Sequence, residues 1–351
     1  MKSISIKLQH HPVTIKEVAA KAGVSTATVS RLLAGKQAAR SEVKNRVLRV
    51  VKELGYEPNH SARNLRTRQR KVFGIVIPDL ENPFFTGIAR GVEETLRTAG
   101  YSLLIAHSDD SPEREEREIR VLRAEGATGL LLIPSRTEAA HYAVFDWAGL
   151  PVVAIDRLPM GWMVDSVKTA NAEGARLATD HLLQLGHDRI AILNGPAHYD
   201  VAQERLAGFR QALAARGVAI PAEWVVHGDF RQESGFQATN SLLQSPQRPR
   251  ALFVANHMMA LGALMAIHEL GLRIPTDVAI ASFDDMPWAA ALNPPLTAVA
   301  QPTRDLGRTA AALLLECLQH PQRAVRQVIL QPSLVVRASC GAMQPKAGVT
   351  S

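Results

Sequence analysis

Short, strongly apolar runs alternate with helical stretches from residue 72 onward, and this alternation constrains the fold more than any other feature of the chain. The runs are VFGIVIP, YSLLIAHS, TGLLLIPS, PVVAIDR, RIAILNGP, EWVVHGD, ALFVANH and DVAIASFDD. Runs that are apolar at consecutive positions are typical of parallel strands buried on both faces, and the stretches 85–98 and 203–216 between them are typical of amphipathic helices. The pattern predicts an α/β architecture of doubly wound parallel sheets. About ten strands are too many for one compact layer, so we expect two lobes.

Residues 14–54 have a different pattern, which predicts three short helices. The segment TIKEVAAKA begins with Thr14 and has Glu17 three residues later, which is the spacing of a capping box. Gly23 suits the left-handed residue that ends a helix, and Ser25 is placed to cap the next one. A third stretch, SEVKNRVLRVVKELG, has a single apolar stripe. Three short helices with a tight turn after the first predict an all-α helix-turn-helix headpiece.

Positive charge is concentrated in this part of the chain. Residues 1–71 contain 16 Lys or Arg and 4 Asp or Glu, a net charge of +12, whereas the other 280 residues contain 24 and 29, a net charge of −5. A charge this concentrated on a short helical segment favours a polyanionic partner over a device for solubility.

The second helix of a helix-turn-helix lies in the major groove of DNA, so its outward face is the candidate for DNA contact. Thr26 and Ala27 are placed to meet base edges, and Arg31 is placed for a bidentate contact to guanine. The hydroxyl groups of this face suit phosphate oxygens and belong to Ser25, Thr28 and Ser30. The alternative is a plain three-helix bundle with a solvated polar face, which the charge of the headpiece disfavours.

The segment YEPNHSARNLRTRQRK, residues 56–71, is basic and has almost no core face. One interpretation is a flexible linker. The other is a short helix that forms on DNA, in which the lone large apolar residue, Leu65, enters the minor groove as a wedge between base steps.

Several protein classes are disfavoured by what the sequence lacks. The start, MKSISIKLQHHP, has no apolar core of a signal peptide, and the longest apolar run, MMALGALMAI, is too short to span a bilayer. The two cysteines, Cys317 and Cys340, match no metal or disulfide pattern, so we expect a cytoplasmic protein. The sequence has no phosphate loop, HExxH or GxSxG motif, so we expect neither an enzyme nor a cofactor or metal.

Polar and aromatic residues follow many of the predicted strands. In doubly wound sheets, ligands bind beyond the carboxyl ends of the strands. PDLENPFF follows the first run, Asp156 and Arg157 follow the fourth, and a loop ending in Arg205 follows the fifth. Phe230, Asn256, Asp284 and Gln301 follow later runs. Aromatic faces with carboxylate, amide and guanidinium groups suit a polyol. Asp109 and Asp110 are interpreted as turn formers.

The chain resembles the LacI (lactose repressor) family of transcriptional regulators in the segments TIKEVAAKAGVSTATVSRLL, LGYEPNHSARNLR, ENPFF, LGHDRIAILNGP, RLAGFRQAL, MALGAL and SFDD followed by NPPLTAV. The resemblance extends from Thr14 to Ser339. It implies a sequence-specific DNA-binding regulator that acts as a repressor, a homodimer on a pseudo-palindromic operator, and a core similar to periplasmic sugar-binding proteins, with two lobes joined by three crossings. It also implies a hinge helix at 58–66.

The resemblance assigns two sets of residues. The DNA-contacting set is Thr14, Ser25, Thr26, Ala27, Thr28, Ser30, Arg31, Asn59, Ala62 and Leu65. The effector-binding set is Asn82, Phe84, Phe85, Asp156, Arg157, Arg205, Phe230, Asn256, Asp284 and Gln301, which is also similar to the set of ribose-binding proteins and favours a pentose or related sugar.

The implied domains are an N-terminal extension (1–12) and a helix-turn-helix domain (13–57), followed by a hinge and linker (58–71), a core (72–340) and a tail (341–351). The extension and the tail are expected to be disordered. Within the core we expect an N-lobe of about 72–165 and 302–328 and a C-lobe of about 166–299 and 329–340.

The chain departs from the family pattern at three positions: His257 replaces the usual Asp, Ala34 a common Asn, and Arg40 a capping Ser. Two alternatives stay open, a purine-responsive regulator of the corepressor type with the same fold and, less favoured, a sugar-acting enzyme.

Overall fold

The computed structural model describes residues 13–33, 41–56, 71–145, 147 and 149–341. It divides into two compact units, Met1–Arg70 and Lys71–Ser351. The expected N-terminal extension, the hinge helix 58–66, the departures at Ala34 and Arg40, and the tail from residue 342 lie outside the described residues.

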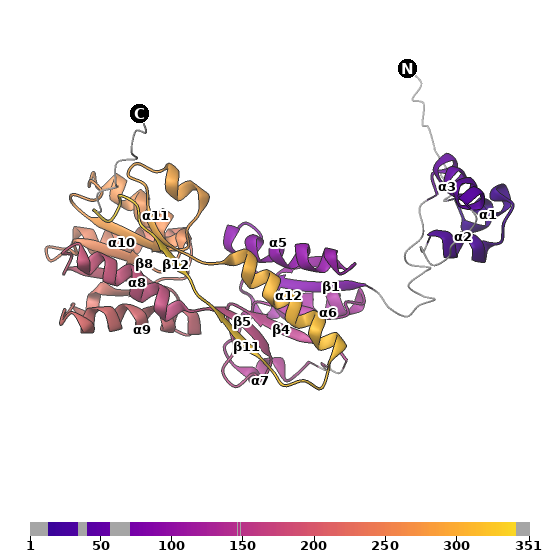
Figure 1. Ribbon diagram of the computed structural model, residues 1–351. Coiled ribbons are helices and arrows are strands. Elements are labelled where there is room, and N and C mark those ends of the chain that lie inside the picture. Colours follow the sequence, from indigo (N-terminus) through magenta and orange to yellow (C-terminus); the bar gives the residue numbers. More distant parts are fainter. Residues whose placement is uncertain (1–12, 34–40, 57–70, 146, 148, 342–351) are drawn as a thin grey trace, which may run out of the picture. The chain divides into compact units, whose positions relative to one another are not determined.

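The first unit contains α1 (Ile15–Ala22), α2 (Thr26–Leu33) and α3 (Ser41–Leu54) (Figure 1). The predicted capping box is present at α1, where the Oγ1 of Thr14 accepts from the backbone N–H of Glu17 at 3.4 Å and the Oε2 of Glu17 accepts from that of Thr14 at 2.6 Å. Gly23 ends α1 at φ +62°. The Oγ of Ser25 accepts from the backbone N–H of Thr28 at 3.1 Å and thereby caps α2. The buried core of the unit is Val18, Ala19, Ala22, Val29, Val47 and Val50.

The N-lobe of the second unit is built on a six-stranded sheet of order β11-β5-β4-β3-β1-β2, with every pair parallel. Its strands are β1 (Val72–Ile77), β2 (Ser102–His107), β3 (Leu130–Leu132), β4 (Val152–Ile155), β5 (Asp165–Thr169) and β11 (Gln327–Leu330), and its helices are α5 (Pro83–Thr98), α6 (Pro112–Ala124), α7 (Ala139–Tyr142) and α12 (Thr303–Gln319).

The C-lobe is built on a second six-stranded sheet of order β12-β10-β9-β8-β6-β7, in which only the pair β10–β12 is antiparallel. Its strands are β6 (Ile190–Asn194), β7 (Val225–His227), β8 (Ala251–Val254), β9 (Ala279–Phe283), β10 (Thr297–Ala300) and β12 (Ser333–Val335), and its helices are α8 (Asn171–Gln184), α9 (Asp200–Ala215), α10 (Gln232–Gln244) and α11 (His257–Glu269), with 3₁₀ turns η1 (Ala222–Trp224) and η2 (Pro287–Ala291).

The chain crosses between the lobes three times, after β5, after β10 and after β11. The first and third crossings come later than the boundaries placed near 165 and 328, because β5 and β11 pair with each other in the N-lobe sheet. The apolar pattern did not reveal β5, β11 or β12. The first of these, DSVKT, has one apolar residue, Val167, and the other two are short strands on either side of Pro332.

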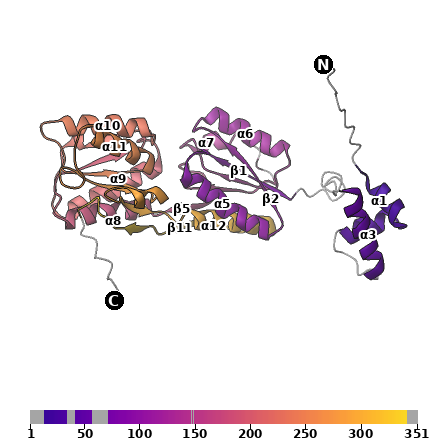
Figure 2. The ribbon, with the colours of Figure 1, turned by 90° about the horizontal axis from the view of Figure 1, so that it is seen from above.

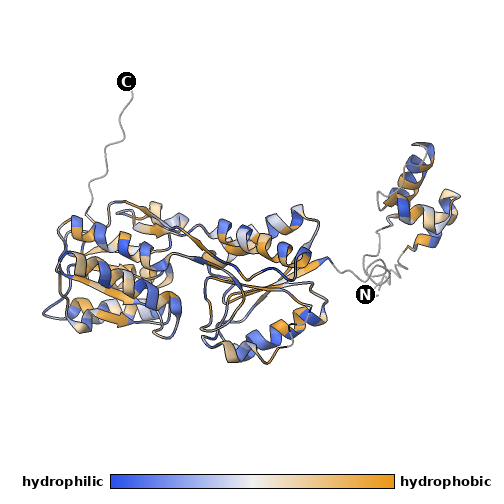
Figure 3. Cartoon of the chain, turned by 60° about the horizontal axis from the view of Figure 1, so that its bottom comes forward, coloured by the Kyte–Doolittle hydropathy of each residue, from blue (hydrophilic) through white to orange (hydrophobic). Residues whose placement is uncertain are grey.

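Helices cover both faces of each sheet, and Figure 2 shows α6 and α7 on the opposite side of the N-lobe sheet from α5 and α12. In the C-lobe, α8 and α9 pack on one face and α10 and α11 on the other. Colouring by hydropathy shows apolar strands inside each lobe and polar outer faces on the helices (Figure 3). No helix of the described residues is long and apolar enough to cross a bilayer.

The contact between α5 and α12 depends on glycine. A Cβ at Gly91 would lie 2.1 Å from the carbonyl oxygen of Arg304, and a Cβ at Gly307 would lie 2.1 Å from that of Ile88. Only glycine lets two helix backbones approach this closely. This close contact fixes α5, whose first turn lines the cleft described below.

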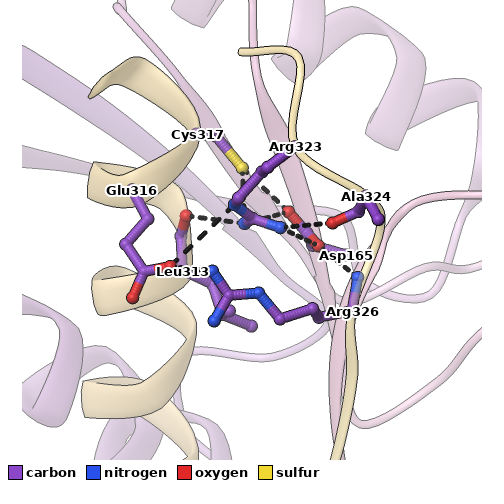
Figure 4. A network of polar contacts seen from close by, with 7 residues as sticks. All are labelled: Asp165, Leu313, Glu316, Cys317, Arg323, Ala324 and Arg326. Carbon is purple, nitrogen blue, oxygen red and sulfur yellow. Dashed lines mark hydrogen bonds and ion pairs between the residues drawn. The ribbon is translucent and has the colours of Figure 1, made fainter. Parts of the chain in front are cut away.

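A buried polar network fixes the segment that leads from α12 to β11 (Figure 4). The two carboxylate oxygens of Asp165 accept from the guanidinium of Arg323 at 2.9 and 2.6 Å, and they also accept from the backbone N–H of Arg326 and the thiol of Cys317. Burial and this carboxylate raise the pKa of Cys317 to about 11. The thiol is therefore protonated at neutral pH and acts as a structural donor.

Candidate effector cleft and nucleic-acid interface

A cleft of about 720 Å³ opens between the two lobes, and all ten residues of the predicted effector set line it. Asp156 directly follows β4, and Asp284 directly follows β9. Phe230 follows β7 after two residues. Because parallel strands present their carboxyl ends at one edge of a sheet, residues far apart in the sequence meet here.

Several of the predicted positions are held by helices. Arg205 was expected at the end of a loop, but it lies within α9, so its position is fixed by the helix. Asn82 is the N-cap of α5, and its Oδ1 accepts from the backbone N–H of Phe84 at 2.9 Å. This cap orients the first turn of α5, where Phe84 and Phe85 lie edge to face with ring centroids 5.1 Å apart.

Three residues of the predicted effector set have left-handed backbones, Asp156 at φ +65°, Phe230 at +65° and Asp284 at +72°. Non-glycine residues rarely adopt this conformation, which costs on the order of 1–3 kcal/mol, and such residues cluster at ligand sites. Gly195 lies beneath Phe230, and a Cβ at that glycine would come within 1.9 Å of the ring. The surrounding fold therefore holds these side chains in orientations that a relaxed chain avoids.

Arg205 is 4% exposed and is fixed on several sides. Its Nε donates to the Oδ1 of Asn171 at 2.9 Å, and its Nη1 donates to the carbonyl of Ala255 at 2.6 Å. Its guanidinium carbon lies 3.9 Å from the ring centroid of Phe283. The guanidinium is thus positioned before any ligand arrives, and its charge acts on the carboxylates of Asp156 and Asp284.

Asp284 is a buried carboxylate surrounded by donors. Its Oδ1 accepts from the Nε2 of Gln301 at 2.6 Å, and its Oδ2 lies 3.0 Å from the Nδ1 of His257. Burial alone would raise the pKa of Asp284, but the hydrogen bond and charge of His257, the charge of Arg205 and the hydrogen bond of Gln301 outweigh it and lower the pKa. Asp284 is therefore ionised at neutral pH.

Asp156 is in the opposite situation. It is 4% exposed, and among the described residues none donates a hydrogen bond to its Oδ1. Burial raises the pKa of Asp156 to about 6, although the guanidinium groups of Arg205 and Arg157 oppose the rise. The Oε1 of Gln301 is likewise buried and without a donor in the described part of the chain. Buried acceptors that line a cleft and have no donor among the described residues are candidate positions for hydrogen bonds from a ligand.

Two aspartates line the cleft that were not predicted from the sequence to do so. Asp109 and Asp110 have the left-handed backbone expected of turn formers, at φ +52° and +56°, but they also line the cleft. The Oδ1 of Asp110 accepts from the Nη1 of Arg157 at 2.5 Å. Both aspartates follow the carboxyl end of β2, so the rule that selected the other residues would have selected them as well. The guanidinium of Arg157 also lies 4.0 Å from the ring centroid of Tyr199, a C-lobe residue.

The predicted DNA-contacting face is present on α2. Ser25, Thr26, Ala27 and Arg31 are exposed, and Thr28 and Ser30 are half-buried. The Nε of Arg31 donates to the carbonyl of Ala27 at 3.3 Å. Thr14 is the N-cap of α1 and is also exposed at the surface of this unit. Asn59, Ala62 and Leu65 lie outside the described residues. The described residues contain no group of three or more His, Cys, Asp or Glu side chains that could hold a metal ion.

Comparisons with known proteins agree with both parts of the structure. Residues 14–59 match the family described as bacterial regulatory proteins, lacI family, and residues 179–340 match a periplasmic binding protein-like domain. The ribose operon repressor of Haemophilus influenzae is 35% identical over 328 residues, which cover 93% of this chain and 98% of that protein. The transcriptional repressor PurR of Photobacterium profundum is 32% identical over 327 residues, which cover 93% and 98%.

Among solved structures, the lac repressor dimer bound to operator and the anti-inducer ONPF superposes with a TM-score of 0.84. It is 30% identical and covers 94% of this chain and 100% of that chain. A helix-turn-helix unit, two parallel-sheet lobes and relatives that span nearly the whole chain lead to one conclusion: the chain belongs to the LacI family of bacterial regulatory proteins.

Proposed function

We propose that this transcriptional regulator binds operator DNA as a cytoplasmic homodimer and represses transcription, and that a pentose or related sugar in the cleft between the lobes controls its DNA binding. Support comes from relatives named as repressors, among them ribose operon repressors. The cleft carboxylates have a binding role in this proposal and no catalytic one.

The observation that most supports a sugar is a pair of buried acceptors, Oδ1 of Asp156 and Oε1 of Gln301, to which no described residue donates a hydrogen bond. A sugar offers several hydroxyl donors on a small carbon frame. Its C–H faces suit the aromatic rings of Phe84, Phe85 and Phe230, which line the same cleft. Arg205, fixed in advance, suits a hydroxyl or ring oxygen as acceptor.

On the DNA side, the proposal assigns base contact to the exposed N-terminal part of α2. Thr26 and Ala27 meet base edges, and Arg31 exchanges its weak bond to the carbonyl of Ala27 for a guanine. The hydroxyls of Ser25, Thr28 and Ser30 and the backbone near Thr14 bind phosphates and set the register. Asn59, Ala62 and Leu65 complete the set in the minor groove.

A purine effector is the second candidate, because PurR proteins are among the relatives and the cleft aromatics also suit the face of a base. The purine and the pentose differ in the number of hydrogen-bond donors that they offer to the buried acceptors. A purine has few hydrogen-bond donors, whereas a pentose has several hydroxyls for Asp156 and Gln301.

Isothermal titration of the full chain with D-ribose, other pentoses and hypoxanthine separates the candidates. We expect a pentose to bind and hypoxanthine to give no heat. Asp156→Asn should weaken pentose binding at least tenfold, because a hydrogen bond to a charged group contributes about 1.5–3 kcal/mol. Asp188→Asn is the matched control, since Asp188 is exposed and does not line the cleft.

The second half of the test is regulation. An operator selected from random DNA should be bound by the full chain, and the pentose that binds the cleft should change that affinity. Binding of hypoxanthine without any sugar would establish the purine alternative. A sugar that binds without altering operator affinity would contradict its role as effector.

A further inference from the structure

His257 lies immediately behind the cleft and does not line it. It is the first residue of α11 and is 2% exposed. The preceding residue, Asn256, is the N-cap of the helix and does line the cleft, and its Nδ2 donates to the carbonyl of Phe230 at 2.8 Å. At the start of α11, Asn256 therefore forms part of the cleft lining, and the next residue, His257, lies behind it.

The contact between His257 and Asp284 has a defined direction. The Nδ1 of His257 lies 3.0 Å from the Oδ2 of Asp284, and the backbone N–H of His257 donates to the same oxygen at 3.4 Å. Asp284 is ionised and can only accept, so Nδ1 bears the proton. The carboxylate also faces the N-terminus of α11, where the helix dipole favours negative charge.

This arrangement limits what Asp284 can do for a ligand. A carboxylate has about four acceptor positions, and His257 and Gln301 together occupy three of them at Asp284. Asp156, by contrast, has an Oδ1 that no described residue contacts through a hydrogen bond. The two carboxylates are therefore unequal, and Asp284 has one acceptor position left in a fixed orientation.

We propose that His257 is a positioning residue of the effector site, which holds the Asp284 carboxylate through Nδ1–H so that it accepts one particular hydroxyl of the sugar. The inference rests on the proposed function. It explains why a buried polar side chain stands at the start of α11, where its Nε2 has no partner among the described residues. In this proposal Asp156 accepts from other hydroxyls of the sugar, so His257 affects the recognition of one hydroxyl alone.

Removal of the Nδ1 donor tests the proposal. His257→Phe keeps a planar ring without a donor, and His257→Asn keeps an N–H near the position of Nδ1. Titration of the full chain with D-ribose should show affinity reduced by about ten- to a hundredfold in His257→Phe and within about threefold of wild type in His257→Asn. His268→Phe, an exposed position near the end of the same helix, is the matched control and should bind normally.

A ligand-side deletion distinguishes positioning from a structural role. The monodeoxy derivatives of D-ribose each lack one hydroxyl. In the wild type, loss of the hydroxyl held by Asp284 should weaken binding about tenfold or more, whereas His257→Phe should bind that derivative about as well as D-ribose. If His257→Phe does not fold, His257→Gln is used in its place. The amide of Gln lies one bond farther from the backbone than that of Asn, so it does not donate to the Oδ2 of Asp284.

The outcomes separate the inference from the function on which it rests. If the wild type and His257→Phe bind D-ribose equally well, or if every deoxy derivative loses the same factor in both proteins, the positioning role is wrong and the sugar-responsive function stands. If the wild type does not bind D-ribose, the proposed pentose function fails and the hydroxyl assignment fails with it.

Discussion

Asp156→Asn should stabilise the folded core at alkaline pH. Burial raises the pKa of Asp156 from 3.8 to about 6, even with two guanidinium groups nearby. Because the folded-state pKa lies above that of the unfolded chain, the folded protein binds this proton more tightly. The resulting stability is fully present below pH 3.8 and is lost as the pH rises through 6.

The size of the effect follows from the two pKa values. A rise from 3.8 to about 6 corresponds to about 3 kcal/mol lost when the carboxylate ionises in the folded state. The amide of Asn resembles the neutral acid and avoids this loss. We therefore expect the free energy of unfolding of Asp156→Asn to exceed that of the wild type by up to about 3 kcal/mol at pH 8 and by about half as much at pH 5.

Urea unfolding followed by tryptophan fluorescence measures this difference in the full chain. All four tryptophans lie between residues 147 and 288, so the signal reports the core and not the helix-turn-helix unit. Asp188→Asn is the control for a generic Asp-to-Asn change at an exposed site. The claim that the ionised carboxylate of Asp156 destabilises the folded core would be refuted by either of two results. One is an Asp156→Asn protein that is less stable than the wild type at pH 8, and the other is a stability difference that is equal at pH 5 and pH 8.

Effector binding should also depend on the ionisation of Asp156, but here the ionised form is the favourable one. Hydroxyl groups donate to the ionised form of Asp156, so sugar affinity of the wild type should fall about tenfold between pH 7 and pH 5, as the carboxylate takes up its proton. Asp156→Asn should bind weakly with a flat pH profile. A residue that improves function while it lowers stability is the pattern expected at a ligand site.

Further outcomes concern DNA and signalling. Phosphate contacts of the basic headpiece should give a slope of about −6 or steeper in log affinity against log salt, and a flat response in a fluorescence assay would exclude them. Arg31→Ala should relax preference at one symmetric pair of base positions at a cost of roughly 1–3 kcal/mol per contact, whereas Thr28→Ala should weaken all sequences alike in a selection from random DNA. Leu65→Ala should reduce operator affinity more than non-specific affinity, and equal losses would indicate a basic tether. Asp284→Asn should keep ligand-free operator binding but lose sugar affinity by tens of fold and remain in the ligand-free state, and normal affinity on titration would remove it from the site.

Local chemistry made much of the fold predictable from the sequence. The capping box at Thr14, the left-handed Gly23 and the cap at Ser25 are short-range features, because donor, acceptor and backbone lie within a few residues. The apolar runs identified most of the central strands of both sheets, since strands buried on both faces are mostly apolar. The interior strand β5 lacked that signal because only one of its five residues is apolar, and its place in the sheet is defined by its pairing with β4 and β11.

That most of the ten residues of the effector set line one cleft was also predictable, because the carboxyl ends of parallel strands converge by topology. Their different roles were not. Asp156 and Asp284 follow strands in the same way in the sequence. Only the tertiary structure places His257 and Gln301 on the carboxylate of Asp284, whose pKa their hydrogen bonds lower. It leaves the Oδ1 of Asp156 without a donor among the described residues, and burial raises the pKa of that carboxyl. Charge state in a buried site depends on which distant groups the fold brings within about 3 Å, and that information is absent from the local sequence.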